Sequence, residues 1–221
     1  MTTDTKIIAI ETSGSNCSVS LLSETTVLCE YTIFKGNKHD KLCAEFIRRC
    51  LVDNELDLKN IDAIAISNGP GSFTGLRIGA AIAKGLTIDN FPKLIAVPTL
   101  SAMVYNIITI DKIKESNIKN ILAIIPSHSN LFYCQKFDKE MKVIEDISII
   151  NFDVLKDKLK EDTFVVSNEP IFENLLYFSC ETLTASIIGR YAFNLYKKSI
   201  FTDSAKLVPI YIQEFIPKMK I

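Results

Sequence analysis

Apolar and polar positions in the first half of the chain change period twice. Short apolar or alternating runs, joined by turns rich in Ser and Thr, predict an antiparallel meander of three strands at 6–11, 17–22 and 27–34. From residue 39 the apolar residues recur at helical spacing, which predicts a helix over 39–51. The next elements predict a right-handed β-α-β unit: a strand at 62–67, a helix at 75–87 and a strand at 93–97. A meander followed by such a unit is typical of the α/β architecture of ribonuclease-H-like folds.

A polar stretch at 113–120 separates these elements from a second set. We expect a connecting helix at 99–110 before it. Beyond it the pattern predicts strands at 121–126, 131–137, 142–149 and 163–167, helices at 152–160 and 182–197, and an extended piece at 207–212. We therefore expect two lobes. Residues 1–110 and the C-terminal segment 205–221 would form the first lobe, and residues 111–204 a second, smaller one.

The composition is that of an ordinary globular protein, with 48% hydrophobic residues and a net charge of −1. No basic excess indicates nucleic-acid binding, so any tRNA contact would be weak or supplied by a partner. The six cysteines are scattered without a Cys-x-x-Cys pair, which favours reduced thiols acting as small core residues over disulfides or zinc ligands. The sequence shows neither a secretory signal nor an apolar run near the ~20 residues of a membrane span, and we expect a cytoplasmic protein without membrane contact.

A glycine-rich turn follows the strand at 62–67 and leads into a helix. Gly69, Gly71 and Ser72 lie in this turn, and backbone N–H groups at a helix N-terminus form a general anion cradle. The turn is neither a Walker loop nor a dinucleotide fingerprint. Two explanations therefore stay open, a tight turn that needs glycine for close packing and a phosphate site.

The helix after this turn is lined with small residues. Gly75, Gly79 and Ala83 recur every four residues, with Ala80 beside them. Each glycine inside a helix costs about 1 kcal/mol against alanine, so close packing should compensate for it. The partner in that packing is either the chain's own sheet or a helix of another protein. Phe73 is likewise either buried under the lobe or an anchor for a partner.

Few other residues suggest chemistry. His39 and His128 are the two histidines, and Cys43, four residues after His39, makes a poor metal pair without further ligands, so we expect no metal site. The sequence contains neither a Gly-x-Ser-x-Gly elbow nor a His-Glu-x-x-His motif, which argues against a hydrolase and a metalloprotease. Glu11 ends the first strand, where sugar-kinase-like folds place a carboxylate for a metal-bound nucleotide.

Four segments carry a family resemblance: Ile-Ala-Ile-Glu-Thr-Ser-Gly-Ser-Asn-Cys-Ser-Val-Ser-Leu-Leu at 8–22, the helix at 39–51, Gly-Pro-Gly-Ser-Phe-Thr-Gly-Leu-Arg-Ile-Gly at 69–79, and Ala-Lys-Gly-Leu at 83–86. Together they are similar to the TsaB (YeaZ) family, bacterial proteins that help to make threonylcarbamoyladenosine in tRNA. The resemblance covers residues 6–103. Where the family has Asp-Ala-Arg-x-Gly-Glu-Val-Tyr, this chain has Pro-Ser-His-Ser-Asn-Leu-Phe-Tyr at 126–133, so the second lobe has diverged.

The resemblance implies an actin-like (ASKHA) fold of two lobes and a noncatalytic subunit. TsaB resembles its catalytic relative TsaD, which carries a metal-binding His-x-x-x-His after the same β-α-β unit. The corresponding residues here are Thr99 and Met103, and neither can replace an imidazole on such a metal. The acidic ligand and the glycine-rich segments that close the nucleotide site of TsaD also have no evident counterpart. ATP and metal would therefore belong to the partner subunits.

The resemblance further implies docking on TsaD through the paired helices 39–51 and 75–87, and help in recruiting the ATPase TsaE. TsaD would move the threonylcarbamoyl group onto N6 of adenosine 37, and tRNA would be reached only through the complex. Alone, the same face would pair with a second copy. The expected interface residues are Leu42, Phe46, Arg49, Cys50, Phe73, Gly75, Leu76, Gly79, Ala80 and Ala83. We assign Arg77 no major role, because exposed ion pairs contribute little.

Under the docking hypothesis, Gly79→Leu or Ala83→Glu should leave the monomer folded but abolish association with TsaD. The alternative hypothesis is an ATP-binding ASKHA-type transferase with its own activity, which would hold the nucleotide with Glu11, Gly69, Gly71 and Ser72.

Overall fold

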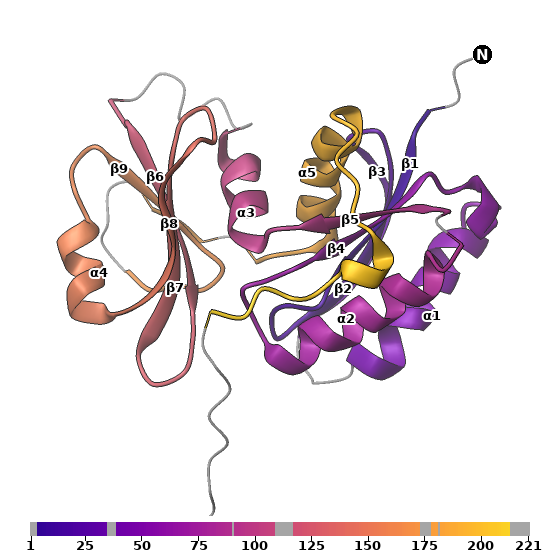
Figure 1. The fold of residues 1–221 in the computed structure, drawn as a ribbon, viewed down its shortest axis with the longest axis horizontal. Coiled ribbons are helices and arrows are strands. Elements are labelled where there is room, and N and C mark those ends of the chain that lie inside the picture. The colour runs from indigo at the N-terminus through magenta and orange to yellow at the C-terminus, as the bar shows by residue number, and fades with distance from the viewer. Residues whose placement is uncertain are drawn as a thin grey trace, which may run out of the picture.

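The computed structural model describes residues 4–34, 39–89, 91–108, 117–172, 178–180 and 182–212. Within these ranges two five-stranded sheets form the framework (Figure 1). The first sheet has the order β3-β2-β1-β4-β5, with bounds β1 Lys6–Glu11, β2 Cys17–Ser23, β3 Thr26–Ile33, β4 Ala63–Ser67 and β5 Lys93–Val97. The second has the order β10-β9-β6-β7-β8, with bounds β6 Asn120–Pro126, β7 Leu131–Asp138, β8 Val143–Asn151, β9 Thr163–Ser167 and β10 Phe178–Cys180.

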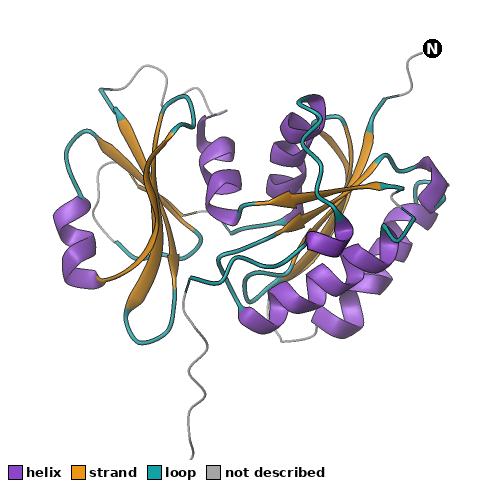
Figure 2. Ribbon diagram, viewed as in Figure 1, coloured by secondary structure: helices purple, strands orange, loops and turns teal. Residues whose placement is uncertain are grey.

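Helices separate and cover the sheets (Figure 2). The described helices are α1 His39–Val52, α2 Phe73–Leu86, α3 Thr99–Ile108, α4 Phe152–Lys158 and α5 Ala185–Lys197, with short 3₁₀ turns η1 Leu58–Asn60 and η3 Ser204–Lys206. Helices α1 and α2 lie side by side on one face of the first sheet, and α5 covers its other face. Helix α3 lies between α5 and the second sheet, whose outer face carries α4. The molecule is therefore a two-lobed stack of alternating helical and sheet layers.

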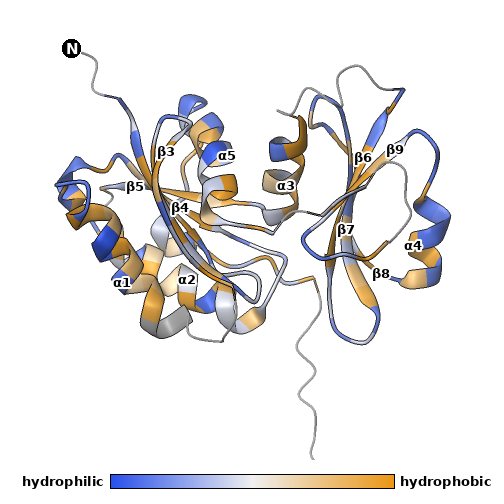
Figure 3. Ribbon diagram, turned by 180° about the vertical axis from the view of Figure 1, so that it is seen from behind, coloured by the Kyte–Doolittle hydropathy of each residue, from blue (hydrophilic) through white to orange (hydrophobic). Residues whose placement is uncertain are grey.

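The central strand β1 explains why the first sheet needs helices on both faces. Its side chains alternate between the two faces, as in any strand. Ile8 and Ile10 pack with α1 and α2, whereas Ile7 and Ala9 pack toward α5. All four are fully buried, so β1 is an uninterrupted apolar run, as expected for a strand covered on both sides. Figure 3 shows the apolar residues gathered on the strands and on α3, in the interior of the stack.

The pairing of the strands confirms the predicted meander and crossover. Strand β1 pairs antiparallel with β2, and β2 with β3. Strand β4 pairs parallel with both β1 and β5, and α2 connects β4 to β5. The predicted bounds of β1, β5 and β9 agree with the structure to the residue. Strand β10 was not predicted, and the last residues of the expected helix 99–110 lie outside the described ranges.

Helix α5 differs from its expected place. The prediction put residues 111–204 in the second lobe, yet α5 packs on the first sheet, against β1 and β2. Gly189 makes this close approach feasible, because a Cβ there would lie 2.2 Å from Leu22 Cδ1. The β3 side chain of Glu30 also holds the start of α5, since its Oε1 accepts a hydrogen bond from Ser186 N at 2.7 Å. Packing complementarity of this kind is not visible in the order of elements along the chain.

Within the described ranges, every helix is too short or too polar to cross a lipid bilayer.

Candidate functional site

The candidate site lies where the parallel strands β1 and β4 end and α2 begins. In open α/β sheets, ligands bind outside the carboxyl ends of the strands. Glu11 ends β1, and the loop 68–72 leads from β4 into α2. The structure therefore brings together the residues for which a nucleotide role was considered, Glu11 and the loop glycines.

Glu11 is fully buried, and none of the described residues gives it a cationic partner. Its Oε1 accepts hydrogen bonds from Ser13 N at 2.5 Å and from Ser13 Oγ at 2.6 Å. Burial raises the pKa of Glu11 from 4.5 to about 7, although the Ser13 hydrogen bonds favour the charged form. The Ser67 hydroxyl on β4 is also close enough to favour the charged form of Glu11. The arrangement of the two groups is nevertheless not that of a hydrogen bond. Glu11 Oε2 and Ser67 Oγ are thus buried without a hydrogen-bond partner among the described residues.

Two amide groups of the glycine-rich loop, those of Gly69 and Ser72, are engaged within the chain. Gly69 N donates to Thr99 Oγ1 at 3.1 Å, and Ser72 N donates to Ser13 O at 2.6 Å. Gly69 O in turn accepts from Thr99 N at 2.9 Å. A phosphate would need such amide donors. The loop therefore tethers α3 and the turn after β1, and its geometry favours the packing explanation over an anion cradle.

Close packing also explains the two loop glycines. Gly69 has a φ of +102°, in the region that favours glycine. A Cβ at Gly71 would lie 2.4 Å from Ser13 O. The site residues Gly69 and Gly71 thus serve the tight turn and the close approach of two loops.

The small residues of α2 face the chain's own sheet. A Cβ at Gly75 would lie 1.9 Å from Thr12 O, and one at Gly79 would lie 2.4 Å from Thr12 Oγ1 and 2.7 Å from Ile66 Cδ1. Six of the ten expected interface residues are buried within the lobe: Cys50, Gly75, Leu76, Gly79, Ala80 and Ala83. This burial corrects the expectation that they form a partner surface. It also corrects the expected outcome for Gly79→Leu and Ala83→Glu, because either change would damage the fold itself.

The other four expected interface residues remain at the surface. Leu42 and Phe46 are half-buried on α1, and Arg49 is exposed there. Phe73 is 40% exposed at the start of α2. Phe46 stacks on Tyr31 of β3, with ring centroids 5.9 Å apart. The residues on the solvent side of the helix pair are therefore the ones available to a partner.

The outward face of α2 was not predicted from the sequence. Ala81 is exposed, and a Cβ at Gly85 would meet nothing within 4 Å. Ile88, just after the helix, is 75% exposed. The spacing of Gly75, Gly79 and Ala83 indicates the opposite, inward face of α2. Ala81 and Gly85 lie half a turn away from that row, and they mark the outward face.

The described part of the C-terminal segment closes over the loop. Ile210 N donates to Asn68 O at 2.8 Å, and the Tyr211 ring lies 5.1 Å from that of Phe73. The Arg77 guanidinium in turn lies 5.3 Å from the centroid of the Phe73 ring. Phe73 is therefore neither fully buried nor isolated, but part of a surface cluster with Arg77 and Tyr211.

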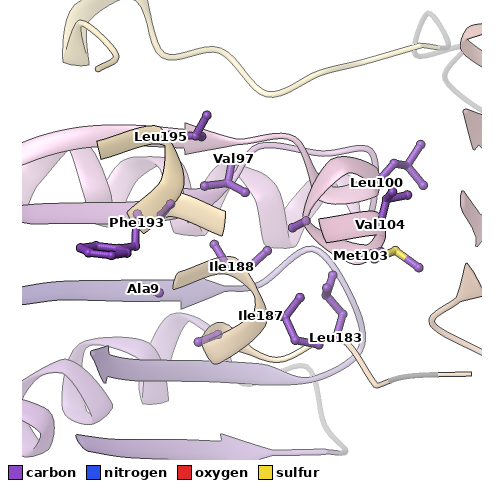
Figure 4. Close-up of a cluster of buried hydrophobic side chains, with 14 of the residues drawn as sticks. Ala9, Val97, Leu100, Met103, Val104, Leu183, Ile187, Ile188, Phe193 and Leu195 are labelled. Atoms are coloured by element: carbon purple, nitrogen blue, oxygen red, sulfur yellow. The ribbon is translucent and has the colours of Figure 1, made fainter. Parts of the chain in front are cut away.

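The space between the lobes is filled by apolar side chains. Figure 4 shows side chains of α3 and α5 meeting over the first sheet. The resemblance to TsaD places histidines at the positions of Thr99 and Met103. Here Thr99 is fully buried, and Met103 is 3% exposed in this cluster. The residues present do not fit a nucleotide with its metal, because Glu11 is a lone carboxylate, the Gly69 and Ser72 amides are already engaged, and Met103 lies in an apolar core.

The remaining candidates for chemistry have ordinary surroundings. No group of three or more His, Cys, Asp or Glu residues within the described ranges could hold a metal ion. His128 is exposed in the turn between β6 and β7, and the side chain of His39 lies outside the described set. Among the cysteines whose side chains are described, five are free thiols, of which Cys17, Cys43, Cys50 and Cys134 are buried. This confirms for those four the prediction of small core residues.

The sequence of this chain is similar to those of known proteins. A family model described as TsaD, tRNA N6-adenosine threonylcarbamoyltransferase, matches residues 34–171. A tRNA threonylcarbamoyladenosine biosynthesis protein TsaB from Buchnera aphidicola subsp. Baizongia pistaciae is 29% identical over 94% of this chain and 98% of its own length. The TsaB of Haemophilus influenzae is 32% identical, over 61% of this chain and 54% of that protein.

Two solved structures share the fold. YeaZ from Pseudomonas aeruginosa superposes with a TM-score of 0.75 at 20% identity, over 93% of this chain and 100% of that one. The activator of 2-hydroxyisocaproyl-CoA dehydratase from Clostridium difficile gives a TM-score of 0.51 at 10% identity, over 88% and 96%. The fold is therefore the expected two-lobed ASKHA-like α/β fold. Together with the family model and the curated relatives, it shows that the chain belongs to the TsaB (YeaZ) family of tRNA threonylcarbamoyladenosine biosynthesis proteins, which are related to TsaD.

Proposed function

We propose that this chain is the noncatalytic, activating subunit of the complex that makes N6-threonylcarbamoyladenosine at position 37 of tRNA. It docks on TsaD through the solvent side of α1 and α2 and helps to recruit the ATPase TsaE. TsaD carries out the transfer, ATP and metal belong to the partner subunits, and tRNA is reached through the complex. In the absence of TsaD, the same face pairs with a second copy.

The main observation that supports the noncatalytic role is the surroundings of Thr99 and Met103. Thr99 Oγ1 accepts the Gly69 N–H, and Met103 packs in the apolar cluster between the lobes. Both positions thus serve packing where TsaD, by the family resemblance, holds a metal. A hard or borderline metal ion needs nitrogen or oxygen ligands, whereas Met103 offers only a thioether sulfur and the buried Thr99 hydroxyl already accepts the Gly69 N–H.

The docking role is supported by what remains exposed on the helix pair. Phe73, Ile88 and Val52 are large apolar side chains with 40%, 75% and 57% exposure, all on or next to α1 and α2. These exposed apolar side chains on the helix pair support its use as a protein–protein contact. The rest of each helix is occupied by the sheet, so contact with a partner uses the outward side.

The test is a substitution on this outward side with a matched control. Ala81→Glu places a bulky charge on the exposed side of α2, and Val154→Glu places the same charge on α4, on the far lobe. Neither position is buried, so both variants should fold. We expect Ala81→Glu to abolish co-purification with TsaD and to leave tRNA without the modified nucleoside in a strain that lacks its own TsaB. Val154→Glu should behave like the wild type, and equal behaviour of the two variants would contradict docking through this face.

The alternative, an ATP-binding transferase, is favoured by one observation, the unpartnered oxygen of Glu11. Calorimetric titration of the isolated chain with ATP and magnesium separates the two functions. Binding in the low micromolar range with turnover would support the transferase. We expect binding that is millimolar or absent.

A further inference from the structure

Four cysteines lie where α1 packs on the first sheet. Cys43 and Cys50 belong to α1, Cys17 to β2 and Cys29 to β3. All four take part in the apolar cluster on this face of the sheet. The contacts of these residues divide them into two pairs, each of which joins α1 to one strand: Cys17 with Cys43, and Cys29 with Cys50.

The strand register directs the Cys29 side chain toward α1. Cys29 and Tyr31 are two residues apart on β3, so their side chains lie on the same face of the strand. Tyr31 stacks on Phe46 of α1, and Cys29 therefore faces α1 as well. The Cys50 thiol approaches from the helix, with its Sγ 4.0 Å from the carbonyl oxygen of Val19, which is the cross-strand partner of Tyr31.

Asn54 connects the two residues of the Cys29–Cys50 pair. Its Nδ2 donates to Cys29 Sγ at 3.3 Å and to Cys50 O at 2.9 Å. One amide group thus holds the sulfur of Cys29 beside the backbone of Cys50. Burial and the neighbouring Cys29 thiol raise the pKa of Cys50, which keeps Cys50 protonated. Two cysteines placed this close across a helix and a strand are candidates for a disulfide.

The two members of this pair differ in their access to solvent. Cys50 is fully buried, whereas Cys29 is half-buried on β3, the edge strand of the first sheet. A β-bulge lies directly before Cys29, with Leu28 as the unpaired residue. Leu28 is 43% exposed, and bulges at sheet edges bend the strand and redirect its side chains. Cys29 is therefore the sulfur that a small solute reaches, and Cys50 lies behind it.

The Cys17–Cys43 pair has the same arrangement without this access. The neighbouring Cys17 thiol, together with burial, raises the pKa of Cys43. Both side chains are fully buried, and β2 lies in the interior of the sheet, between β3 and β1. The two pairs thus resemble each other in position and differ in exposure, so one serves as the internal control for the other.

We propose that Cys29 and Cys50 are a peroxide-sensitive thiol pair that forms a disulfide between β3 and α1. The Cys29 sulfur attacks hydrogen peroxide. A sulfur–oxygen bond forms as the oxygen–oxygen bond breaks, and the Cys29 proton leaves in a first water, which makes Cys29 a sulfenic acid. The Cys50 sulfur then attacks the Cys29 sulfur, and the hydroxyl group leaves with the Cys50 proton as a second water. The thiols lose two electrons in total, and these reduce the peroxide.

The experiment treats the reduced full chain with hydrogen peroxide and blocks the remaining thiols with N-ethylmaleimide under denaturing conditions. Mass spectrometry of a non-reduced digest then maps the disulfides, and dimedone traps sulfenic acids. Cys29→Ser removes the accessible thiol, and Cys50→Ala removes the buried one. Cys43→Ala is the matched control, because it removes a buried thiol of the same helix from the other pair. Circular dichroism checks the fold of each variant.

We expect a Cys29–Cys50 disulfide in the wild type and in Cys43→Ala, reversed by dithiothreitol, while Cys17 and Cys43 of the wild type stay reduced. Cys50→Ala should accumulate a dimedone-reactive sulfenic acid at Cys29. In Cys29→Ser, Cys50 should be oxidised at least about tenfold more slowly than in the wild type, because it is buried and protonated.

Two results would overturn the proposal. The first is a wild-type chain in which peroxide leaves Cys29 and Cys50 unlinked, whether both remain thiols or Cys29 proceeds to a sulfinic acid. The second is a Cys17–Cys43 disulfide that forms as fast as the Cys29–Cys50 one, because exposure would then not determine which pair reacts. Both results come from the wild-type chain, so they decide the proposal even where a variant does not fold.

Discussion

Replacing Glu11 by glutamine should make the protein more stable at neutral pH. The Glu11 carboxyl is fully buried with no cation beside it among the described residues, and burial raises its pKa from 4.5 to about 7. Glutamine has nearly the same shape, and its carbonyl oxygen can still accept the hydrogen bonds from Ser13 N and Ser13 Oγ. Its amide can donate toward Ser67 Oγ, which has no hydrogen-bond partner among the described residues.

The size of the effect follows from the two pKa values. Because the folded pKa is above the unfolded one, the stabilising contribution of the neutral carboxyl is complete below pH 4.5. This contribution decreases as the pH rises. It is lost above about pH 7, where the carboxyl group is charged in both the folded and the unfolded protein. A difference of about 2.5 pKa units at 1.36 kcal/mol each corresponds to a destabilisation of roughly 3 kcal/mol at pH 8.

Urea denaturation of the wild type and of Glu11→Gln between pH 4 and pH 9 measures this directly. We expect equal free energies of unfolding near pH 4, and a difference that grows in favour of the variant and levels off at roughly 3 kcal/mol above pH 7. A difference that does not change with pH would refute the reasoning. So would a variant that is less stable than the wild type at pH 8, because the carboxylate would then have a partner that stabilises its charged form.

Two further substitutions test the packing of the site. Gly79→Ala should cost about 1–3 kcal/mol in the free energy of unfolding, because its Cβ would meet Thr12 and Ile66, whereas Gly85→Ala, on the open side of the same helix, should stabilise the protein by up to about 1 kcal/mol. Equal effects in thermal and urea denaturation would contradict the assigned faces of α2. Combining Thr99→His with Met103→His restores the histidine spacing of TsaD but should lower stability by about 3 kcal/mol or more without creating a zinc site, since both positions are buried. Stoichiometric zinc in a folded double variant, measured by metal analysis, would show that the space between the lobes still accepts a metal.

The sequence predicted most elements because their periods are unambiguous. Strand β1 and helix α1 are examples, since an apolar run bounded by turns and a wide apolar stripe each correspond to one kind of element. The position of α5 was not predictable in the same way. Its apolar stripe fits either sheet, and only the close approach of Gly189 to Leu22 and the Glu30 cap decide for the first.

The residues of the candidate site were grouped from the sequence, but their contacts were not predicted. The alternative hypothesis grouped Glu11 with the loop at 69–72, and the structure does bring them together, because they follow the neighbouring parallel strands β1 and β4. It did not show that Thr99 and Ser13 occupy the hydrogen-bonding groups of Gly69 and Ser72, since those contacts join residues far apart in the chain. The periodicity of Gly75, Gly79 and Ala83 revealed a face in close contact, but period alone does not say whether the contact is with the chain itself or with a partner.

The central claim is that this chain activates TsaD by docking and contributes no chemistry of its own. The most direct measurement is the yield of N6-threonylcarbamoyladenosine in a reconstituted mixture of TsaD, TsaE, tRNA, ATP and the threonylcarbamoyl donor, with the wild-type chain or with Glu11→Gln. We predict that the modification requires the chain and that Glu11→Gln supports the wild-type rate, because the one buried carboxylate of the site has a structural role only. Loss of the modification with Glu11→Gln, while the complex with TsaD still forms, would contradict the account.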